Sequence, residues 1–123
     1  MKKILAFEDN QNLLDEFKNE YQKLGFEFLG LPFPPEDLIA LILRFKPDII
    51  SMDVTMPYMD GISAAKIIKA NPQTAGIPLF FYTNMGRPED KGRGKALGAA
   101  GYFLKTEISP LELVKLVPGL LNS

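Results

Sequence analysis

The sequence contains no cysteine and no histidine among its 123 residues. Without cysteine there is no disulfide scaffold and no thiolate zinc site. Without histidine there is no imidazole-ligated metal and no nucleophile activated by an imidazole. Any acid, base or metal ligand must therefore be a carboxylate, a lysine, a tyrosine, a hydroxyl group or the backbone. Excess charge is also lacking, because 14 basic residues oppose 15 acidic ones. This balance argues against direct binding of nucleic acid.

Long hydrophobic runs are missing as well. The longest uncharged apolar run covers residues 38–43, whereas a membrane-spanning helix needs roughly 20 residues. The apolar stretch at 4–7 is too short for the core of a signal peptide. We therefore expect a cytoplasmic protein without membrane contact. Hydrophobic residues make up 46% of the chain, so we expect one packed domain over residues 1–123, with no room for a further output domain.

Short apolar segments alternate with segments in which apolar residues have helical spacing. The alternation predicts an α/β fold with a parallel sheet and helices on both faces. The expected strands are 3–7, 26–31, 48–52, 77–82 and 100–104, and the expected helices are 10–24, 36–46, 62–70, 88–97 and a last one after Ser109.

Several residues mark the expected helix ends. Asp9 or Asn10 is suited to cap the first helix, and Gly25 to end it. Pro35 is suited to open the second helix, because its fixed φ matches the first helical position. We expect Pro118 with the glycine after it to end or kink the last helix.

Polar side chains stand where the expected strands end. They are Glu8, Asp9, Asp53, Thr83 and Lys105. The carboxyl ends of parallel strands meet at one edge of a sheet, where ligands bind in such folds. Three close carboxylates repel one another unless a cation joins them. An oxygen-only site suits Mg²⁺ or Mn²⁺ and not zinc, and a lysine beside it can bind a transferring phosphoryl group.

Each member of this set, taken singly, also has a simpler explanation. Glu8 and Asp9 favour a helix N-terminus through the helix dipole, and Lys105 can be a solvated charge. Thr83 can be a β-branched strand terminus. Asp53 is explained poorly in this way, because it stands at the mouth of a buried strand with no helix to cap. The recurrence of such residues at strand ends favours a site.

Four segments resemble the receiver domains of two-component response regulators, which have the CheY-like fold. The segments are Ile4–Asn10, Pro47–Gly61, Ile77–Thr83 and Gly98–Lys105, and the stretch from Asp53 to Gly61 is the most specific. The resemblance covers residues 2–121. It implies a doubly wound five-stranded parallel sheet with strand order 2-1-3-4-5 and five flanking helices.

The resemblance implies a role for each residue of the set. Asp53 is the phosphoacceptor, which takes a phosphoryl group from a phosphohistidine of a sensor histidine kinase or phosphotransfer protein. Asp9, Asp53 and the backbone carbonyl of Thr55 bind Mg²⁺ (or Mn²⁺) directly, and Glu8 acts through water. Lys105 contacts the phosphoryl oxygens. Such a domain catalyses only its own phosphorylation and dephosphorylation.

The resemblance also implies a switch. Thr83 moves toward the phosphate and Tyr102 turns inward, which changes the surface of the fourth helix, fifth strand and fifth helix. An unknown downstream protein, or a second copy of the chain, is expected to bind there. Gly92 and Gly94 each cost about 1 kcal/mol relative to alanine in a helix. The helix at 88–97 is therefore expected to be the element with two arrangements.

The chain departs from the family pattern at two places. Thr106 follows Lys105 where proline is usual, and we expect a trans bond, since a non-proline cis bond costs about 3 kcal/mol. Asn84 stands where a very small residue is usual, which predicts slower phosphorylation by small donors. Thr55 and Met85 occupy positions that tune hydrolysis, and neither can hold a water as a carboxylate does. This favours a persistent aspartyl phosphate.

Other interpretations stay open. The basic cluster of Arg87, Lys91, Arg93 and Lys95 is either a solvated helix face or a docking patch for an acidic partner. Asn84 and Thr106 leave room for a receiver-fold interaction module that phosphorylation does not regulate. A flavodoxin-like cofactor binder is disfavoured, because acidic residues stand where that site needs a glycine-rich loop.

Overall fold

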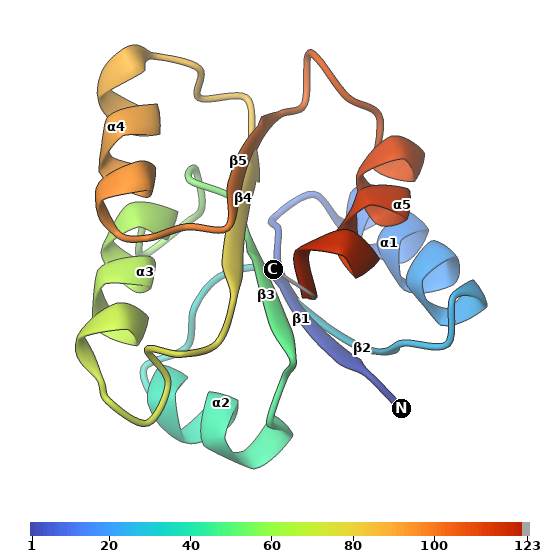
Figure 1. The fold of residues 1–123 in the computed structure, drawn as a ribbon, viewed down its shortest axis with the longest axis horizontal. Helices are drawn as coiled ribbons and strands as arrows, with labels where there is room; N and C mark the ends of the chain where they lie inside the picture. Colours follow the sequence, from blue (N-terminus) through green and yellow to red (C-terminus); the bar gives the residue numbers. More distant parts are fainter. Residues whose placement is uncertain (122–123) are drawn as a thin grey trace.

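The computed structural model describes residues 1–121, so the last two residues of the domain expected over 1–123 lie outside it. Within residues 1–121 five strands and five helices alternate (Figure 1). The strands are β1 (Lys3–Phe7), β2 (Glu27–Leu31), β3 (Ile49–Met52), β4 (Leu79–Thr83) and β5 (Gly101–Leu104). The helices are α1 (Gln11–Lys23), α2 (Leu38–Phe45), α3 (Gly61–Ala70), α4 (Pro88–Ala96) and α5 (Pro110–Leu121).

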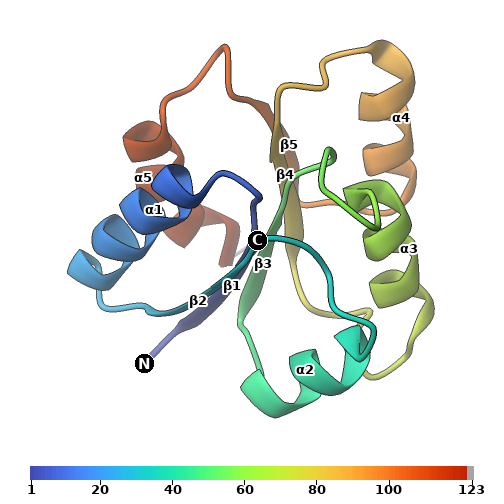
Figure 2. The ribbon, with the colours of Figure 1, turned by 180° about the vertical axis from the view of Figure 1, so that it is seen from behind.

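The strands form one parallel sheet in the order β2-β1-β3-β4-β5, which confirms the expected fold class and strand order. Helices α1 and α5 cover one face, and α2, α3 and α4 cover the other (Figures 1 and 2). Along the chain, β2 is placed on one side of β1, and β3 is then placed on the other side. The carboxyl ends of β1 and β3 therefore flank the crevice in which such sheets bind ligands.

Two apolar clusters, one on each face of the sheet, form the core. Neighbouring strand residues point to opposite faces, so Ile4 and Ile49 join the cluster under α1 and α5, whereas Leu5 and Ile50 join the cluster under α2 and α3. All four side chains are completely buried. This explains why β1 appears in the sequence as a continuous apolar run from Ile4 to Phe7 rather than as an alternating pattern.

The helix ends agree with the expected capping residues in part. The Asn10 side chain accepts a hydrogen bond from the Leu13 N–H at 3.0 Å and so caps α1, and Gly25 follows that helix with a φ of +88°. Pro35 does not open α2, which begins at Leu38. That helix starts where its first side chain reaches the core, since Glu36 and the residue after it are exposed.

The last helix is longer than expected. We expected Pro118 to end or kink α5; it does not end the helix, which continues through Pro118 to Leu121. Leu120 and Leu121 pack against the cluster that contains the buried Val114, and this contact favours the last turn.

The Lys105–Thr106 bond is trans, as expected, because residues 1–121 contain no cis peptide bond.

Tyr21 of α1 carries a buried hydroxyl without a partner. Its ring lies among Phe17, Phe26 and Phe28, with centroid distances of 5.5–6.0 Å, and its oxygen makes no hydrogen bond among the described residues. We expect Tyr21→Phe to raise the free energy of unfolding by about 1 kcal/mol in urea, because it removes an unsatisfied buried group. Tyr82→Phe is the matched control, since it removes a hydroxyl that donates to the Ile108 carbonyl at 2.8 Å. The control should lose stability, and a less stable Tyr21→Phe would show that this hydroxyl is hydrated.

Candidate functional site

The five residues at the strand ends line one cavity of about 560 Å³ at the carboxyl edge of the sheet. Glu8 and Asp9 follow β1, Asp53 follows β3, Thr83 ends β4, and Lys105 follows β5. The cavity also touches three further residues from the same edge, which are Asn10, Thr55 and Asn84. The site predicted from the strand ends is therefore one continuous pocket.

Two hydrogen bonds extend the sheet by one residue and so place the key side chains. The Asp53 N–H donates to the Phe7 carbonyl at 3.1 Å, which carries Asp53 to the end of β1. The Lys105 N–H donates to the Thr83 carbonyl at 2.9 Å, which carries Lys105 to the end of β4. Because the backbone stays paired at these positions, both side chains start from a rigid support.

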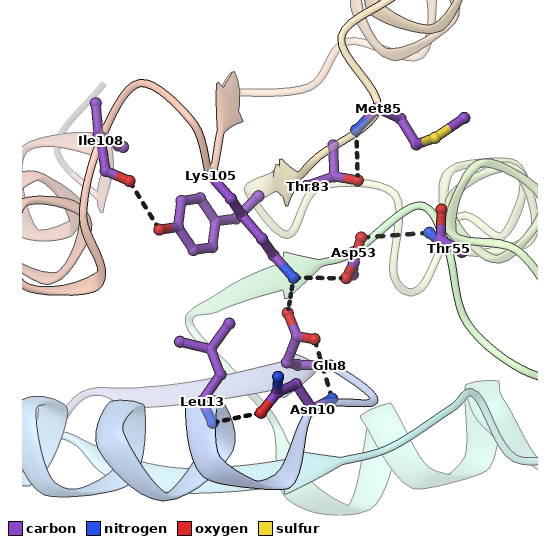
Figure 3. Close-up of polar contacts among 10 residues, drawn as sticks. Glu8, Asn10, Leu13, Asp53, Thr55, Thr83, Met85, Lys105 and Ile108 are labelled. Atoms are coloured by element: carbon purple, nitrogen blue, oxygen red, sulfur yellow. Dashed lines mark hydrogen bonds and ion pairs between the residues drawn. The ribbon is translucent and has the colours of Figure 1, made fainter.

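The three carboxylates differ in exposure. Glu8 and Asp53 are only 2% and 5% exposed, whereas Asp9 is exposed at the mouth. One oxygen of each lies within 4.8 Å of the others, so the three can share one cation. Backbone N–H groups orient the buried pair: Asn10 donates to Glu8 at 3.1 Å and Thr55 to Asp53 at 3.2 Å (Figure 3). The contact from Asn10 was not anticipated, because the sequence marks that residue only as a helix cap.

Lys105 lies between the two buried carboxylates. Its Nζ is 2.7 Å from Glu8 Oε1 and 2.9 Å from Asp53 Oδ2 (Figure 3). Burial lowers the pKa of Lys105, but the hydrogen bonds to Glu8 and Asp53 outweigh it, and the net pKa is raised. Three carboxylates and one ammonium leave a formal charge of −2. This charge and the all-oxygen ligand set match a divalent cation such as Mg²⁺.

Glu8 has the most unusual ionisation in the site. Burial raises its pKa from 4.5 to about 7, against the opposing hydrogen bond from Lys105. Between these two pH values the folded protein holds a proton that the unfolded chain has released. In the absence of metal, the free energy of unfolding should therefore fall as pH rises from about 4.5 to about 7, by up to about 3 kcal/mol.

Urea unfolding across this pH range measures the effect. Glu8→Gln should flatten the slope, because the amide does not titrate, while the exposed control Glu27→Gln should keep it. An unchanged slope in Glu8→Gln would contradict the raised pKa.

The two expected switch residues meet at the backbone of Met85. The Thr83 hydroxyl accepts a hydrogen bond from the Met85 N–H at 3.2 Å, and the Tyr102 hydroxyl donates to the Met85 carbonyl at 2.6 Å. The Tyr102 ring packs against Phe81 with 5.4 Å between centroids. Thr83 and Tyr102 are thus linked through one peptide segment. Sequence patterns gave no signal for this link, because both contacts use the backbone of Met85.

Helix α4 is held to the sheet by few side chains. Its two buried residues are Asp90 and Gly94. A Cβ on Gly94 would lie 2.9 Å from the Tyr102 ring and 3.3 Å from the Phe81 ring, so the helix rests on these rings through a glycine. Asp90 pairs with the exposed Arg87 at 3.0 Å. The helix therefore lacks the apolar stripe that anchors most surface helices.

The basic cluster divides along α4. Arg87 is engaged by Asp90, whereas Lys91 and Lys95 line a shallow groove with Ala99, Gly101 and Tyr102. All four basic side chains of the cluster are exposed. Both interpretations of the cluster, a solvated face and a docking patch, remain compatible with this placement.

A comparison with protein families identifies the family to which the chain belongs. The family model described as the response regulator receiver domain matches residues 4–117. The chain belongs to this family. Receiver domains act in two-component signalling, and the acidic pocket with Lys105 is consistent with a phosphoacceptor site.

Individual receivers resemble the chain over nearly its full length. Protein PilH of Pseudomonas aeruginosa is 30% identical over 105 residues, which are 85% of this chain and 86% of that protein. The chemotaxis protein CheY4 of Vibrio cholerae has a solved structure with a TM-score of 0.85 and 28% identity, and 98% of each chain is covered. The receiver domain of a DNA-binding response regulator from Colwellia psychrerythraea gives 0.84 and 29%, with both chains fully covered.

Other relatives contain a receiver within a longer protein. The gliding motility regulatory protein of Myxococcus xanthus is 43% identical over 61 residues, half of this chain but 8% of that protein. For a probable cyclic di-GMP phosphodiesterase of Vibrio cholerae, the match covers 17% of the protein.

Among the described residues of the present receiver, no helix has the length and apolar character to cross a membrane.

Proposed function

We propose that this receiver accepts a phosphoryl group on Asp53 from a phosphohistidine of a sensor histidine kinase or phosphotransfer protein. The observation that carries the proposal is the pairing of Asp53 with Lys105 at 2.9 Å, at the base of a pocket that gathers two further carboxylates. A nucleophilic carboxylate, a fixed cation and a cation-binding oxygen set are the parts that phosphoryl transfer needs.

In the proposed reaction, an Asp53 carboxylate oxygen forms a bond to phosphorus while the phosphorus–nitrogen bond of the donor breaks. The electron pair of that bond stays on the imidazole nitrogen, and the ring leaves with its remaining proton on the other nitrogen. Lys105 follows the transferred charge and contacts the phosphoryl oxygens, so that its ammonium offsets the negative charge. The Thr55 N–H, 3.2 Å from Asp53 Oδ1, keeps the carboxylate in the attacking orientation.

Mg²⁺ or Mn²⁺ fits this site as a cofactor. Asp9, Asp53 and the backbone carbonyl of Thr55 would hold it, and Glu8 would act through water. When bound, the ion neutralises charge on the transferring phosphoryl oxygens. Glu8 must be ionised to support the ion, so its raised pKa predicts weaker metal binding below about pH 7.

Phosphorylation is proposed to act on α4 through Thr83. A phosphoryl oxygen gives the Thr83 hydroxyl a strong acceptor for its proton, so the hydroxyl turns toward it and gives up the hydrogen bond that it accepts from the Met85 N–H. Tyr102, bound to the same segment, then changes the surface of α4, β5 and α5, which we propose binds a downstream protein or a second copy.

Hydrogen exchange tests the proposed switch. Beryllofluoride, a phosphate mimic, is expected to change amide protection across residues 88–98, because α4 has two inner glycines and little apolar contact. The amides of α1 serve as the internal control and should keep their protection. Unchanged protection across 88–98 would contradict the proposed role of α4.

Phosphotransfer profiling tests the function itself. The parent protein is mixed with a panel of purified, ³²P-labelled histidine kinases and phosphotransfer domains, with Mg²⁺ or with EDTA. We expect metal-dependent label on the receiver from at least one donor. The alternative, an interaction module without phosphate regulation, predicts no label from any donor and no uptake of beryllofluoride.

A further inference from the structure

An aromatic pair of one half-buried ring, Phe33, and one exposed ring, Tyr58, lies outside both clusters of the core. Phe33 belongs to the loop after β2, and Tyr58 to the loop after β3. Their rings meet edge to face, with 4.7 Å between centroids. Tyr58 is nevertheless 89% exposed, as much as the N-terminal methionine. Tyr58 therefore buries little surface in this fold and presents an apolar ring to solvent.

Tyr58 is also held in a strained backbone conformation. The Met59 N–H donates to the Pro57 carbonyl at 2.8 Å, which closes a three-residue turn centred on Tyr58, and the φ of Tyr58 is +70°. Turns of this form are rare, and side chains larger than asparagine seldom adopt them. A large aromatic side chain at such a position costs stability that burial does not return, so a role in folding does not explain it.

The strand order gives the position of the pair relative to the pocket. Strand β1 lies between β2 and β3, so the loops after β2 and β3 leave the sheet on either side of the carboxyl end of β1. That end carries Glu8 and Asp9. Phe33 and Tyr58 therefore lie at the same carboxyl edge as Glu8 and Asp9, beside the pocket rather than in its lining, whereas Lys105 enters the pocket from β5.

We propose that Phe33 and Tyr58 form a docking platform for the phosphodonor protein. The inference rests on the proposed function, because a donor must bring its phosphohistidine to Asp53, which is only 5% exposed. A protein surface over the pocket must then cover the rim. With Met1, Tyr58 is the most exposed large apolar side chain among the described residues, and exposed aromatic rings are typical anchors of protein interfaces.

The surroundings of the pocket indicate the chemistry of the donor protein that binds the platform. The donor carries its phosphohistidine on a surface with an apolar patch beside it, which covers the two rings. A small donor such as phosphoramidate reaches Asp53 without covering the platform. Protein donors and small donors should therefore respond differently to changes at Phe33 and Tyr58.

The experiment compares the two kinds of donor on the same variants. The protein donor is the fastest member of the labelled panel, and the small donor is phosphoramidate. Tyr58→Gly and Phe33→Ala should each lower kcat/KM for the protein donor about tenfold, through a higher KM. The ratio of the protein-donor rate to the phosphoramidate rate should fall by the same factor. Ile67→Ala is the matched control, an exposed apolar residue of α3 away from the mouth, and should leave the ratio unchanged.

Thermal unfolding separates docking from folding. Glycine accepts the positive φ of this turn, so Tyr58→Gly should melt at the same temperature as the parent or higher while its protein-donor kinetics weaken. An unchanged ratio in both variants would overturn the platform. Equal losses with both donors would also overturn it, because Tyr58 would then only shape the pocket. A parent that accepts phosphate from no donor would instead overturn the proposed function, and the platform with it.

Discussion

An Asp53→Asn variant takes up no measurable phosphate from a protein donor or from phosphoramidate: this is the largest effect we expect. The amide keeps the shape of the side chain. Its oxygen can still accept the hydrogen bond that the Thr55 N–H donates to Asp53 Oδ1 at 3.2 Å in the parent. It is neutral and a poor nucleophile, so the bond to phosphorus does not form. Label incorporation and intact-mass measurement at saturating Mg²⁺ record the result.

The control for this variant is Asp37→Asn, which neutralises an exposed carboxylate next to α2 and away from the pocket. It should incorporate label like the parent. Circular dichroism of both variants shows whether the fold is kept. If Asp53→Asn still carried label, peptide mapping would locate another acceptor, and the role proposed for Asp53 would be wrong.

Gly61→Ala is expected to destabilise the protein by about 3 kcal/mol or more and to displace Asp53, the proposed phosphoacceptor. A Cβ at Gly61 would lie 1.9 Å from the backbone oxygen of Asp53, a distance that side-chain movement cannot relieve. The Gly61 N–H also donates to the Val54 carbonyl at 2.8 Å, which ties the start of α3 to the loop after Asp53. Overpacking against backbone moves the whole loop, so both stability and phosphate uptake should fall.

Urea unfolding and the phosphoramidate reaction measure the two effects. Gly76→Ala is the matched control, because a Cβ there meets no atom within 4 Å. The control should stay within about 1 kcal/mol of the parent. A Gly61→Ala protein as stable and as reactive as the parent would show that the loop packs less closely than described.

Much of the fold follows from local sequence patterns. The continuous apolar run of β1 and the alternation of short apolar segments with segments of helical spacing predict a parallel sheet, since both faces of such strands must be covered. The helix ends were less predictable. Pro35 has the right φ to open a helix, yet α2 starts at Leu38 because tertiary packing decides the first turn. Pro118 lies inside α5 for a similar reason.

The members of the site were predictable, but their contacts were not. Glu8, Asp53 and Lys105 could be identified from the sequence because each follows a predicted strand, and parallel strands end at one edge of the sheet. Which carboxylates Lys105 reaches depends on side-chain conformations that no spacing encodes. The platform was not predictable either, because the φ of Tyr58 and its contact with Phe33 come from two loops that are distant in sequence.

The two ion pairs of Lys105 have a consequence for how the site responds to cations. The ammonium is tethered to the fold, so it faces Glu8 and Asp53 at a fixed, high effective concentration. A divalent ion that bound the oxygens now paired with Lys105 would have to compete with this ammonium. The lysine would thus be a built-in competitor for cations in the pocket. Its strength would help to set the concentration of free divalent ion that the pocket needs.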